Sequence, residues 1–330
     1  MHIYIDIVDA CNCRCKGCPT TYFGKNTPGR MQPELYSKIL HKAIAEYGPE
    51  CVAFYNWTEP LLHPELHSFV ASTKKARTSI VTAVSSNLSI VNIDPLLKAI
   101  GGGLDLLIVS VSGYSQETHS RYHVHGDIQR VRDNLETVSA YVKRNSYRTK
   151  IEVHYLQFGD NKSDERMMER YCQRIGVTFE PKMASYAKGV DDPDNMNRLI
   201  CRPDVRAQGI CLDLNDRLKG SYIAGSSPCM QIFDTLAIDH RGDAFLCCNR
   251  FYFEEYRVGH FLDLSPEELL YYRIIHPECY HCGGQRRPAT AEDFARVQKS
   301  LYLVSRRDSA WIERMTINGV FYYPEYRRQQ

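Results

Sequence analysis

The stretch HIYIDIVDACNCRCKGCP, residues 2–19, places four cysteines directly after a short run of β-branched and aromatic residues. The run at 2–8 predicts a β-strand, so the cysteines fall on the loop that follows it. Three of them have the spacing Cys11-x3-Cys15-x2-Cys18. Three thiolates on one tight loop can hold three irons of a 4Fe–4S cube and leave the fourth iron open for a chelating ligand.

The fourth cysteine of this loop, Cys13, lies between the other positions and breaks their spacing, so we leave it out of the ligand set. A structural zinc site and plain buried thiols are the alternatives. Structural zinc sites favour four ligands in paired spacing, whereas this loop offers three in an uneven one. The pattern therefore favours an iron–sulfur cluster.

Composition limits the classes of function. The chain has 330 residues, of which 43% are apolar and 24% charged, and its net charge is only +2. Such a balance disfavours nucleic acid and anionic membranes as principal partners. The sequence contains neither a long apolar run nor a secretory signal, so we expect a cytoplasmic protein. In a reducing compartment the 13 cysteines do not indicate a disulfide framework.

Strand and helix patterns alternate through the first 183 residues. The expected strands are 2–8, 51–55, 78–85, 104–111, 150–158 and 177–183, and the expected helices are 33–47, 64–75, 93–100, 127–144 and 163–175. This order predicts a parallel α/β sheet with right-handed crossovers, either open or closed into an incomplete barrel. In both cases the functional edge is formed by the carboxyl ends of the strands.

The alternation stops after residue 183, and the chain changes character. We expect a connector at 186–228 and a small second unit at 229–285, followed by a helix at 291–304 and an aromatic tail within 286–330. The second unit should contain a hairpin of strands 232–238 and 244–248 around a turn at 239–243, and a helix at 266–275.

The segment Cys11-Asn12-Cys13-Arg14-Cys15-Lys16-Gly17-Cys18-Pro19 resembles the signature of radical S-adenosylmethionine (SAM) enzymes. Asn56-Trp57-Thr58-Glu59-Pro60, at the end of the second strand, resembles the family's Gly-Gly-Glu-Pro segment, which binds the methionine amino group. Asn56, Trp57 and Thr58 replace the usual small residues, but Glu59 can still accept a hydrogen bond from an ammonium.

Further polar residues end the third and fourth strands, where the family places contacts to methionine or ribose. They are Ser85, Asn87, Ser110 and Ser112. Each alone would be interpreted as a helix cap or turn residue, and only their shared placement at strand ends supports the resemblance. The resemblance covers roughly residues 1–185 and implies an incomplete (β/α)6 barrel that binds SAM.

The resemblance also implies a reaction. The open iron chelates the amino and carboxylate groups of SAM, and one electron from a partner such as flavodoxin or ferredoxin enters the sulfonium. Methionine and a 5′-deoxyadenosyl radical are released, and the radical takes a hydrogen atom from an unactivated C–H bond. The cofactors carry this chemistry, whereas the protein positions them.

A second set of cysteines, Cys229, Cys247, Cys279 and Cys282, resembles the auxiliary-cluster part of a SPASM or twitch domain. Full SPASM domains carry further cysteines, and none follows Cys282, so the resemblance implies one fully ligated auxiliary 4Fe–4S cluster. A zinc ribbon is the alternative. Cys248 neighbours Cys247 on the expected strand, so their side chains should point oppositely. Cys248 is then a packed thiol, an alternative ligand or a hydrogen-atom donor.

The family resemblance leaves the substrate open. We expect a small polar metabolite, such as a sugar, aminocyclitol or nucleoside-like molecule, and we expect oxidation because a second cluster can accept the substrate electron. One alternative is epimerisation of a sugar or aminoglycoside with Cys248 as hydrogen donor. Another is modification of a ribosomally made peptide, although peptide modifiers often carry an N-terminal leader-binding module and this chain begins its first strand at residue 2. A non-enzymatic iron–sulfur electron carrier is the third.

Overall fold

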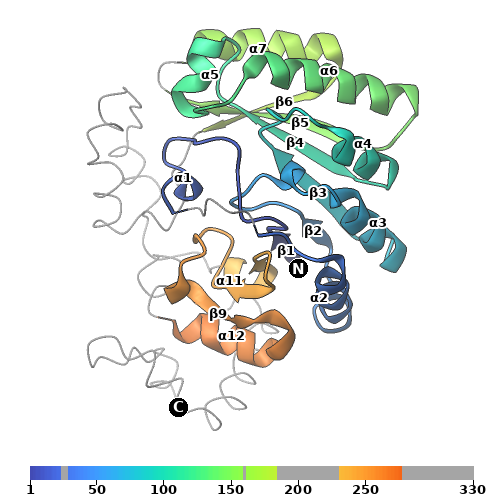
Figure 1. Cartoon of the computed structure of the whole chain (residues 1–330), viewed down its shortest axis with the longest axis vertical. Coiled ribbons are helices and arrows are strands. Elements are labelled where there is room, and N and C mark those ends of the chain that lie inside the picture. The colour runs from blue at the N-terminus through green and yellow to red at the C-terminus, as the bar shows by residue number, and fades with distance from the viewer. Residues whose placement is uncertain (24–28, 159–160, 184–229, 277–330) are drawn as a thin grey trace.

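The computed structural model describes residues 1–23, 29–158, 161–183 and 230–276 (Figure 1). Within these ranges the strands form one mixed sheet in the order β6-β5-β4-β3-β2-β1-β7-β8-β9. The strands are β1 His2–Ile5, β2 Cys51–Ala53, β3 Val81–Ser86, β4 Leu106–Val111, β5 Lys150–Gln157, β6 Thr178–Met183, β7 Thr235–Ile238, β8 Asp243–Phe245 and β9 Arg257–His260.

The described helices follow the strands along the chain. They are α1 Pro19–Phe23, α2 Pro33–Glu46, α3 Leu66–Ala76, α4 Asp94–Gly101, α5 Gln116–Tyr122, α6 Ile128–Arg144, α7 Lys162–Ile175, α11 Met230–Asp234 and α12 Pro266–Ile275. Short 3-10 turns occupy Pro60–Leu62, Glu254–Tyr256 and Phe261–Asp263. In the described ranges we find no helix with the length and apolar character needed to cross a membrane.

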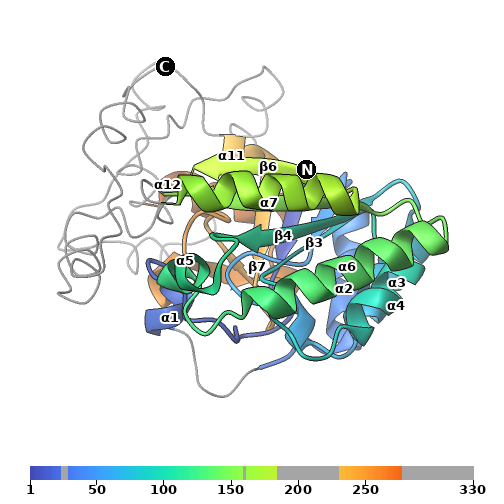
Figure 2. The same ribbon diagram turned by 90° about the horizontal axis from the view of Figure 1, so that it is seen from above.

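Strand order distinguishes the two architectures that the sequence left open. Strands β1 to β6 are parallel and adjacent in chain order, so every crossover advances in the same direction. Right-handed crossovers that all advance one way place their helices on one side of the sheet. Figures 1 and 2 show α2, α3, α4, α6 and α7 along that outer side. The expectation of an incomplete (β/α)6 barrel is therefore confirmed.

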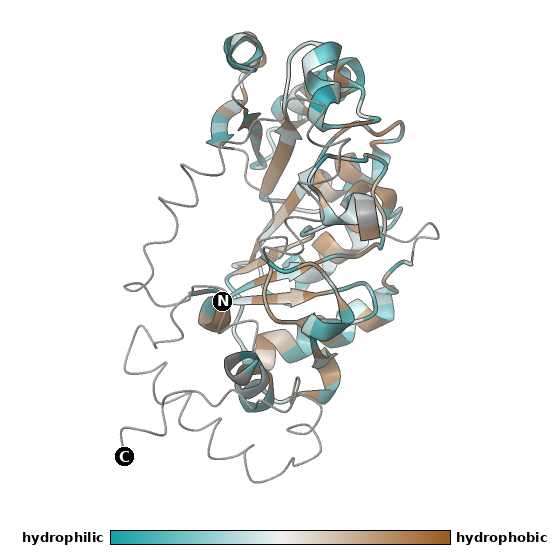
Figure 3. Cartoon of the chain, turned by 90° about the vertical axis from the view of Figure 1, so that its left-hand side faces the viewer, coloured by the Kyte–Doolittle hydropathy of each residue, from teal (hydrophilic) through white to brown (hydrophobic). Residues whose placement is uncertain are grey.

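The two faces of the parallel strands differ in polarity. Alternate residues such as Ile3, Val84 and Val109 are completely buried and pack against apolar helix residues in one continuous core. The strands are accordingly mainly hydrophobic in Figure 3. Each fully buried aliphatic side chain of this kind contributes about 1.5–3 kcal/mol. The inner face, turned away from the helices, carries half-buried residues such as Tyr4 and Ser110.

The C-terminal hairpin continues the same sheet. Strand β7 pairs in parallel with β1, with His2 opposite Thr235, and β8 and β9 extend the sheet in antiparallel fashion. The carboxyl end of β7 therefore lies beside that of β1. The turn between β7 and β8 closes with the Asp239 carboxylate accepting from the backbone amides of Arg241 and Asp243 at 2.9 and 3.0 Å, as the expected turn at 239–243 requires.

Two details of this hairpin differ from expectation. The apolar run at 232–238 is not a single strand, because its first part belongs to helix α11 and only Thr235–Ile238 is extended. Short apolar runs do not distinguish a buried helix from a buried strand. Cys247 and Cys248 lie beyond the end of β8, so the predicted strand alternation of their side chains is wrong. The connector at 186–228 and the helix at 291–304 lie outside the described residues.

Candidate active site

The cysteine loop lies at the carboxyl end of β1, as predicted. Burial, with a further contribution from the charge of Cys11, raises the pKa of the Cys18 thiol to about 11. Cys15 is likewise raised in pKa, with burial and the charges of Cys18 and Cys11 among the causes. These thiols share a site of low polarity, where bound iron would stabilise their thiolate forms.

The donor set of this loop fits an iron–sulfur cluster, because cysteine thiolates are the ligands that hold such clusters. Cys11, Cys15 and Cys18 are the residues that would hold it.

Backbone contacts fix the loop in place. The Arg14 guanidinium donates to the carbonyl of Cys11 at 2.7 Å. The amides of Arg14 and Lys16 donate to the carbonyls of Val124 and Tyr122 at 2.8 and 3.1 Å. The loop is therefore fastened to the segment between α5 and α6. Sequence reasoning treated Arg14 as part of a signature and did not assign it this positioning role.

Cys13 is buried, and its thiol forms hydrogen bonds with those of Cys11 and Cys15. We nevertheless expect Cys13→Ala to retain all of the iron and most of the SAM cleavage, because Cys13 is outside the signature spacing. Anaerobic reconstitution followed by iron and sulfide assays checks this. Loss of about four irons per chain would show that Cys13 is a ligand and that the assigned register is wrong.

The second strand end is held by Asp6, a residue that sequence reasoning missed. Its side chain is 1% exposed. One carboxylate oxygen accepts from the Asn56 amide at 2.9 Å and from the Thr58 hydroxyl at 2.7 Å, and the other accepts from the Trp57 amide at 2.9 Å. Burial raises the pKa of Asp6 to about 6, although these donors oppose the shift. The sequence contained one signal for this role. Asp6 is an acidic residue within the apolar strand predicted at 2–8, and a buried charge needs partners.

The residues that replace the family's small ones contact the C-terminal half of the chain. The Trp57 indole N–H donates to the Arg250 carbonyl at 3.0 Å, and the Asn56 side-chain amide donates to the Tyr252 hydroxyl at 3.3 Å. The rings of Trp57 and Phe251 lie edge to face at 5.8 Å. The Asn56–Thr58 loop is thus packed against the segment that follows Cys247.

Glu59 joins this loop to the third strand and approaches the cysteine loop. It is 2% exposed, and its two oxygens accept from the amides of Leu61 at 3.1 Å and Asn87 at 2.9 Å. The Asn87 side-chain amide lies 3.8 Å from the Cys11 sulfur. Burial raises the pKa of Glu59 to about 7. Each carboxylate oxygen keeps a further lone pair, so an ammonium can still be accepted.

The four predicted polar contacts fall into different surroundings. The Asn87 side chain lies beside Cys11, and Ser85 and Ser110 are half-buried on the inner face. The Ser112 hydroxyl is buried, donates to the His119 carbonyl at 3.2 Å and lies 2.7 Å from His123 Nδ1. Ser112 therefore links the end of β4 to helix α5 in the structure.

Two more polar residues on the inner face were missed. His154 of β5 lies in register with Ser110 of β4, and its Nε2 is 3.1 Å from the Glu152 carboxylate. Because strand residues alternate between faces, Glu152, His154 and Ser110 share one side. The alternation of the predicted strand at 150–158 was the signal that could have identified this pair.

Cys248 has a defined environment near the inner face. Its thiol donates to the Gln231 side-chain carbonyl at 3.0 Å. Burial raises the pKa of Cys248 to about 11, so the thiol stays protonated at neutral pH. Its charge would interact with Tyr4 and Tyr55, whose rings lie edge to face on β1 and just after β2. Of the expected auxiliary ligands, Cys229, Cys279 and Cys282 lie outside the described residues.

Comparison with known proteins supports the signature. The Radical SAM superfamily model matches residues 5–171, about half of the chain. Among solved structures, native anSMEcpe with bound AdoMet is 12% identical with a TM-score of 0.57, covering 91% of this chain and 96% of that chain. No curated relative matches the chain in sequence.

Two other solved structures show different ligands. Streptococcus suis SuiB bound to precursor peptide SuiA is 10% identical with a TM-score of 0.58, covering 88% of this chain and 68% of that chain. BtrN in complex with AdoMet and 2-DOIA is 16% identical with a TM-score of 0.47, covering 82% of this chain and 81% of that chain. At such identities the likeness to anSMEcpe and SuiB shows a common fold and leaves the substrate open.

Proposed function

The chain belongs to the radical SAM superfamily, and we propose that it uses the 5′-deoxyadenosyl radical to oxidise a small polar metabolite at a C–H bond. The observation that carries this proposal is the meeting of three strand ends. The cysteine loop follows β1, Glu59 follows β2, and Asn87 follows β3 within 3.8 Å of the Cys11 sulfur. SAM and a cluster bound here would supply the radical.

Each residue of this edge then has a distinct task. Cys11, Cys15 and Cys18 hold the cluster, while Glu59 accepts the methionine ammonium of SAM. Asp6 keeps the Asn56–Thr58 loop in the conformation that faces the cofactor, because three amides or hydroxyls converge on its carboxylate. Ser85 and Ser110, further along the inner face, are placed to contact hydroxyl groups of the ribose or of the substrate.

The inner face supports a polar substrate. His154 and Glu152 form a hydrogen-bonded pair there, and Ser110 lies in register with His154. Oxidation of an alcohol to a carbonyl requires a group that accepts the hydroxyl proton, and a histidine oriented by a carboxylate is suited to that task. Sugars, aminocyclitols and nucleoside-like metabolites offer the hydroxyl groups that such a face can bind.

The electron released in an oxidation needs an acceptor. We propose that Cys229, Cys247, Cys279 and Cys282 bind one auxiliary cluster in a twitch-like unit, and that this cluster takes the electron. The support is the cysteine spacing together with the fold likeness to SPASM/twitch-type enzymes. Cys247 lies three residues before Arg250, whose carbonyl receives the Trp57 hydrogen bond, so this unit is connected to the SAM-binding loop.

Epimerisation is the second candidate, because the protonated Cys248 thiol lies close to Tyr4 and Tyr55 near the inner face. A thiol in that state can return a hydrogen atom to a substrate radical. Peptide modification has as its support the fold likeness to SuiB with its bound precursor peptide. A simple electron carrier would not cleave SAM, so reductive cleavage of SAM excludes that alternative.

Product analysis distinguishes oxidation from epimerisation. With a panel of sugars and aminocyclitols, we expect one 5′-deoxyadenosine per turnover and a product two mass units lighter. Cys248→Ala should then slow turnover only modestly, because only a packed thiol is lost. A product of unchanged mass that gains one deuterium from deuterated water would overturn oxidation. In that case Cys248→Ala would still yield 5′-deoxyadenosine but no epimer.

A further inference from the structure

The loop that follows β3 holds a buried leucine in an unfavourable backbone conformation. Leu88 has a φ of +53°, in the left-handed region that residues other than glycine rarely adopt, and its side chain is completely buried. Such a conformation persists only where the surrounding contacts hold it in place. The preceding residue is Asn87, whose backbone amide donates to Glu59 at 2.9 Å. The strain therefore lies beside the proposed site of SAM binding.

Helix α6 supplies contacts that hold this leucine. The side-chain nitrogen of Asn134 donates to the Leu88 carbonyl at 3.0 Å and to the Ile90 carbonyl at 2.8 Å. Both partners are acceptors, so the amide group of the asparagine must face them with its two N–H donors. An aspartate of the same shape would place a carboxylate oxygen against two carbonyl oxygens. The position thus requires a side chain with two donors on one atom.

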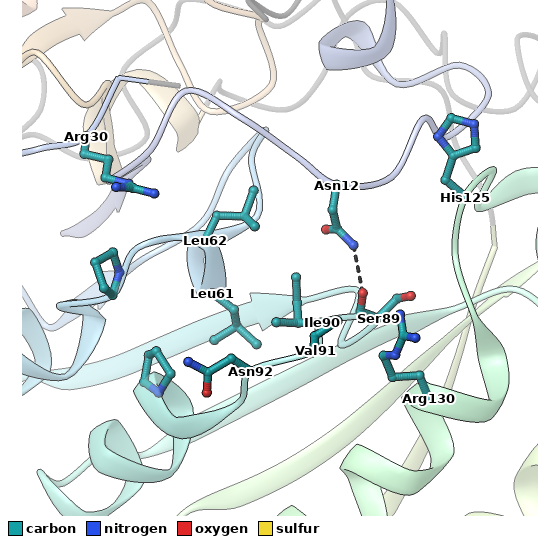
Figure 4. Close-up of a pocket in the computed structure, with 12 residues that line it drawn as sticks. Asn12, Arg30, Leu61, Leu62, Ser89, Ile90, Val91, Asn92, His125 and Arg130 are labelled. Atoms are coloured by element: carbon teal, nitrogen blue, oxygen red, sulfur yellow. Dashed lines mark hydrogen bonds between the residues drawn. The ribbon is translucent and has the colours of Figure 1, made fainter. Parts of the chain in front are cut away.

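The cysteine loop contacts the same segment through Asn12. The Asn12 side-chain amide donates to the Ser89 carbonyl at 2.9 Å, as Figure 4 shows, and its side-chain oxygen accepts from the Asn87 side chain at 2.9 Å. Asn12 and Asn134 thus bind three successive carbonyls between them. The Asn87 side chain also lies 3.8 Å from the Cys11 sulfur. The loop after β3 therefore joins helix α6 to the cysteine loop.

From these contacts we propose that Asn134 is a positioning residue for SAM. It holds Leu88 in the left-handed conformation, and this conformation presents Asn87 to Glu59 and to the cysteine loop. The inference rests on the proposed function, in which Glu59 accepts the methionine ammonium. Asn134 acts through Asn87 and not by touching SAM itself.

Loss of the two donors releases the strain in this loop. Leu88 can then relax to a negative φ, which reorients the peptide bond that joins it to Asn87. The Asn87 amide moves relative to Glu59, and the carboxylate loses one of the two backbone donors that fix its orientation. Glu59 then faces SAM in several orientations, of which only some accept the ammonium.

Asn134→Ala should weaken SAM binding about tenfold, because the apparent affinity falls with the fraction of molecules whose loop keeps the strained conformation. Asn134→Asp, which keeps the shape and replaces both donors with an acceptor, should weaken it at least as much. Equilibrium dialysis of labelled SAM with the oxidised, reconstituted protein measures the affinity. The iron content of both variants should equal that of the wild type, because no thiol is altered.

The matched control is Ser139→Ala on the same helix. The buried Ser139 hydroxyl donates to the Ile175 carbonyl at 2.9 Å, so this variant also loses a bond from α6 to a backbone carbonyl, but away from the loop after β3. Ser139→Ala and Asn134→Ala should both lower the melting temperature. Only the Asn134 variants should change SAM affinity.

Hydrogen–deuterium exchange of the loop gives a readout that needs no SAM. In the reconstituted protein, the amides of Leu88 and Ser89 are bonded to the side chains of Ser86 and Asn87 at 2.8 Å, and their exchange should be faster in Asn134→Ala but not in Ser139→Ala. Wild-type SAM affinity in Asn134→Ala, or weakened binding with unchanged exchange, would overturn the positioning role. A wild-type protein that holds iron but neither binds nor cleaves SAM would instead overturn the proposed function.

Discussion

Simultaneous replacement of Cys11, Cys15 and Cys18 with Ala is expected to abolish reductive cleavage of SAM and to remove about half of the bound iron. With one cluster on this loop and one auxiliary cluster, anaerobic reconstitution should give about eight irons per wild-type chain and about four in the triple variant. In the triple variant Cys13 is the only thiol left on this loop, and one thiol does not retain a cube. Iron assays and chromatography of 5′-deoxyadenosine measure both effects.

A matched control is available in Cys172→Ala. Cys172 is a completely buried thiol on α7, away from the cysteine loop, and burial raises its pKa to about 12. Its replacement should leave the iron content and SAM cleavage intact and cost only some packing energy. SAM cleavage that persists in the triple variant would contradict the cluster assignment. Complete loss of iron in that variant would instead contradict the second cluster.

Local sequence patterns predicted the parallel half of the fold well. Helix α2 begins at Pro33 as expected, where proline suits the first turn, and ends within one residue of the predicted boundary. Helix α6 begins after Asp127, whose carboxylate accepts from the Arg130 amide at 3.1 Å. Strand β4 has the nearly continuous apolar run of a strand that is covered on its outer face. Such signals lie within a few neighbouring residues, so one sequence contains them.

Long-range placement could not be predicted in the same way. The pairing of β7 with β1 joins residues more than 200 positions apart, and nothing in either strand specifies its neighbour. Helix α11 occupies part of a predicted strand, and the buried Arg273 side chain contacts the chain at its end. The Arg273 guanidinium donates to the carbonyls of Leu246 at 2.7 Å and Thr235 at 2.9 Å. These contacts depend on the folded chain.

The candidate site shows the same division. Its cysteines and Glu59 could be proposed from the sequence because they form short motifs, whereas Asp6 contacts partners about 50 residues away. Trp57 first looked like a departure from the family pattern. In the structure its indole N–H reaches the Arg250 carbonyl, so the larger residue has a role that glycine could not fill. The departure therefore marks where the Asn56–Thr58 loop and the C-terminal unit meet.

Asp6→Asn is expected to weaken SAM binding about tenfold or more. The amide presents an N–H group where the carboxylate now accepts from Trp57 or from Asn56 and Thr58, so at least one buried donor loses its partner. A hydrogen bond to a charged group contributes about 1.5–3 kcal/mol, and 1.4 kcal/mol corresponds to a tenfold change in affinity. Equilibrium dialysis of labelled SAM with the oxidised, reconstituted protein measures the affinity without turnover.

The control for this variant is Asp105→Asn at the opposite end of the sheet. The Asp105 carboxylate accepts from the Thr82 amide at 2.7 Å and its hydroxyl at 3.0 Å, so a similar arrangement is disrupted away from the site. Both variants should lower the melting temperature, but only Asp6→Asn should change SAM affinity. Equal SAM affinity in Asp6→Asn and wild type would show that Asp6 does not position the loop.

The pH dependence of SAM binding gives an independent test of the same carboxylate. Because burial raises the pKa of Asp6 to about 6, the group is ionised at pH 8 and becomes protonated as the pH falls through 6. Protonation removes an acceptor from the Asn56–Thr58 loop, so wild-type affinity should decline over this interval. Glu59, whose pKa burial raises to about 7, also loses its charge as the pH falls from 8 to 6, and this loss weakens ammonium binding.

Asp6→Asn should therefore remove the part of the decline in affinity centred near pH 6 and retain the part near pH 7. An unchanged pH profile in Asp6→Asn would assign the whole dependence to Glu59.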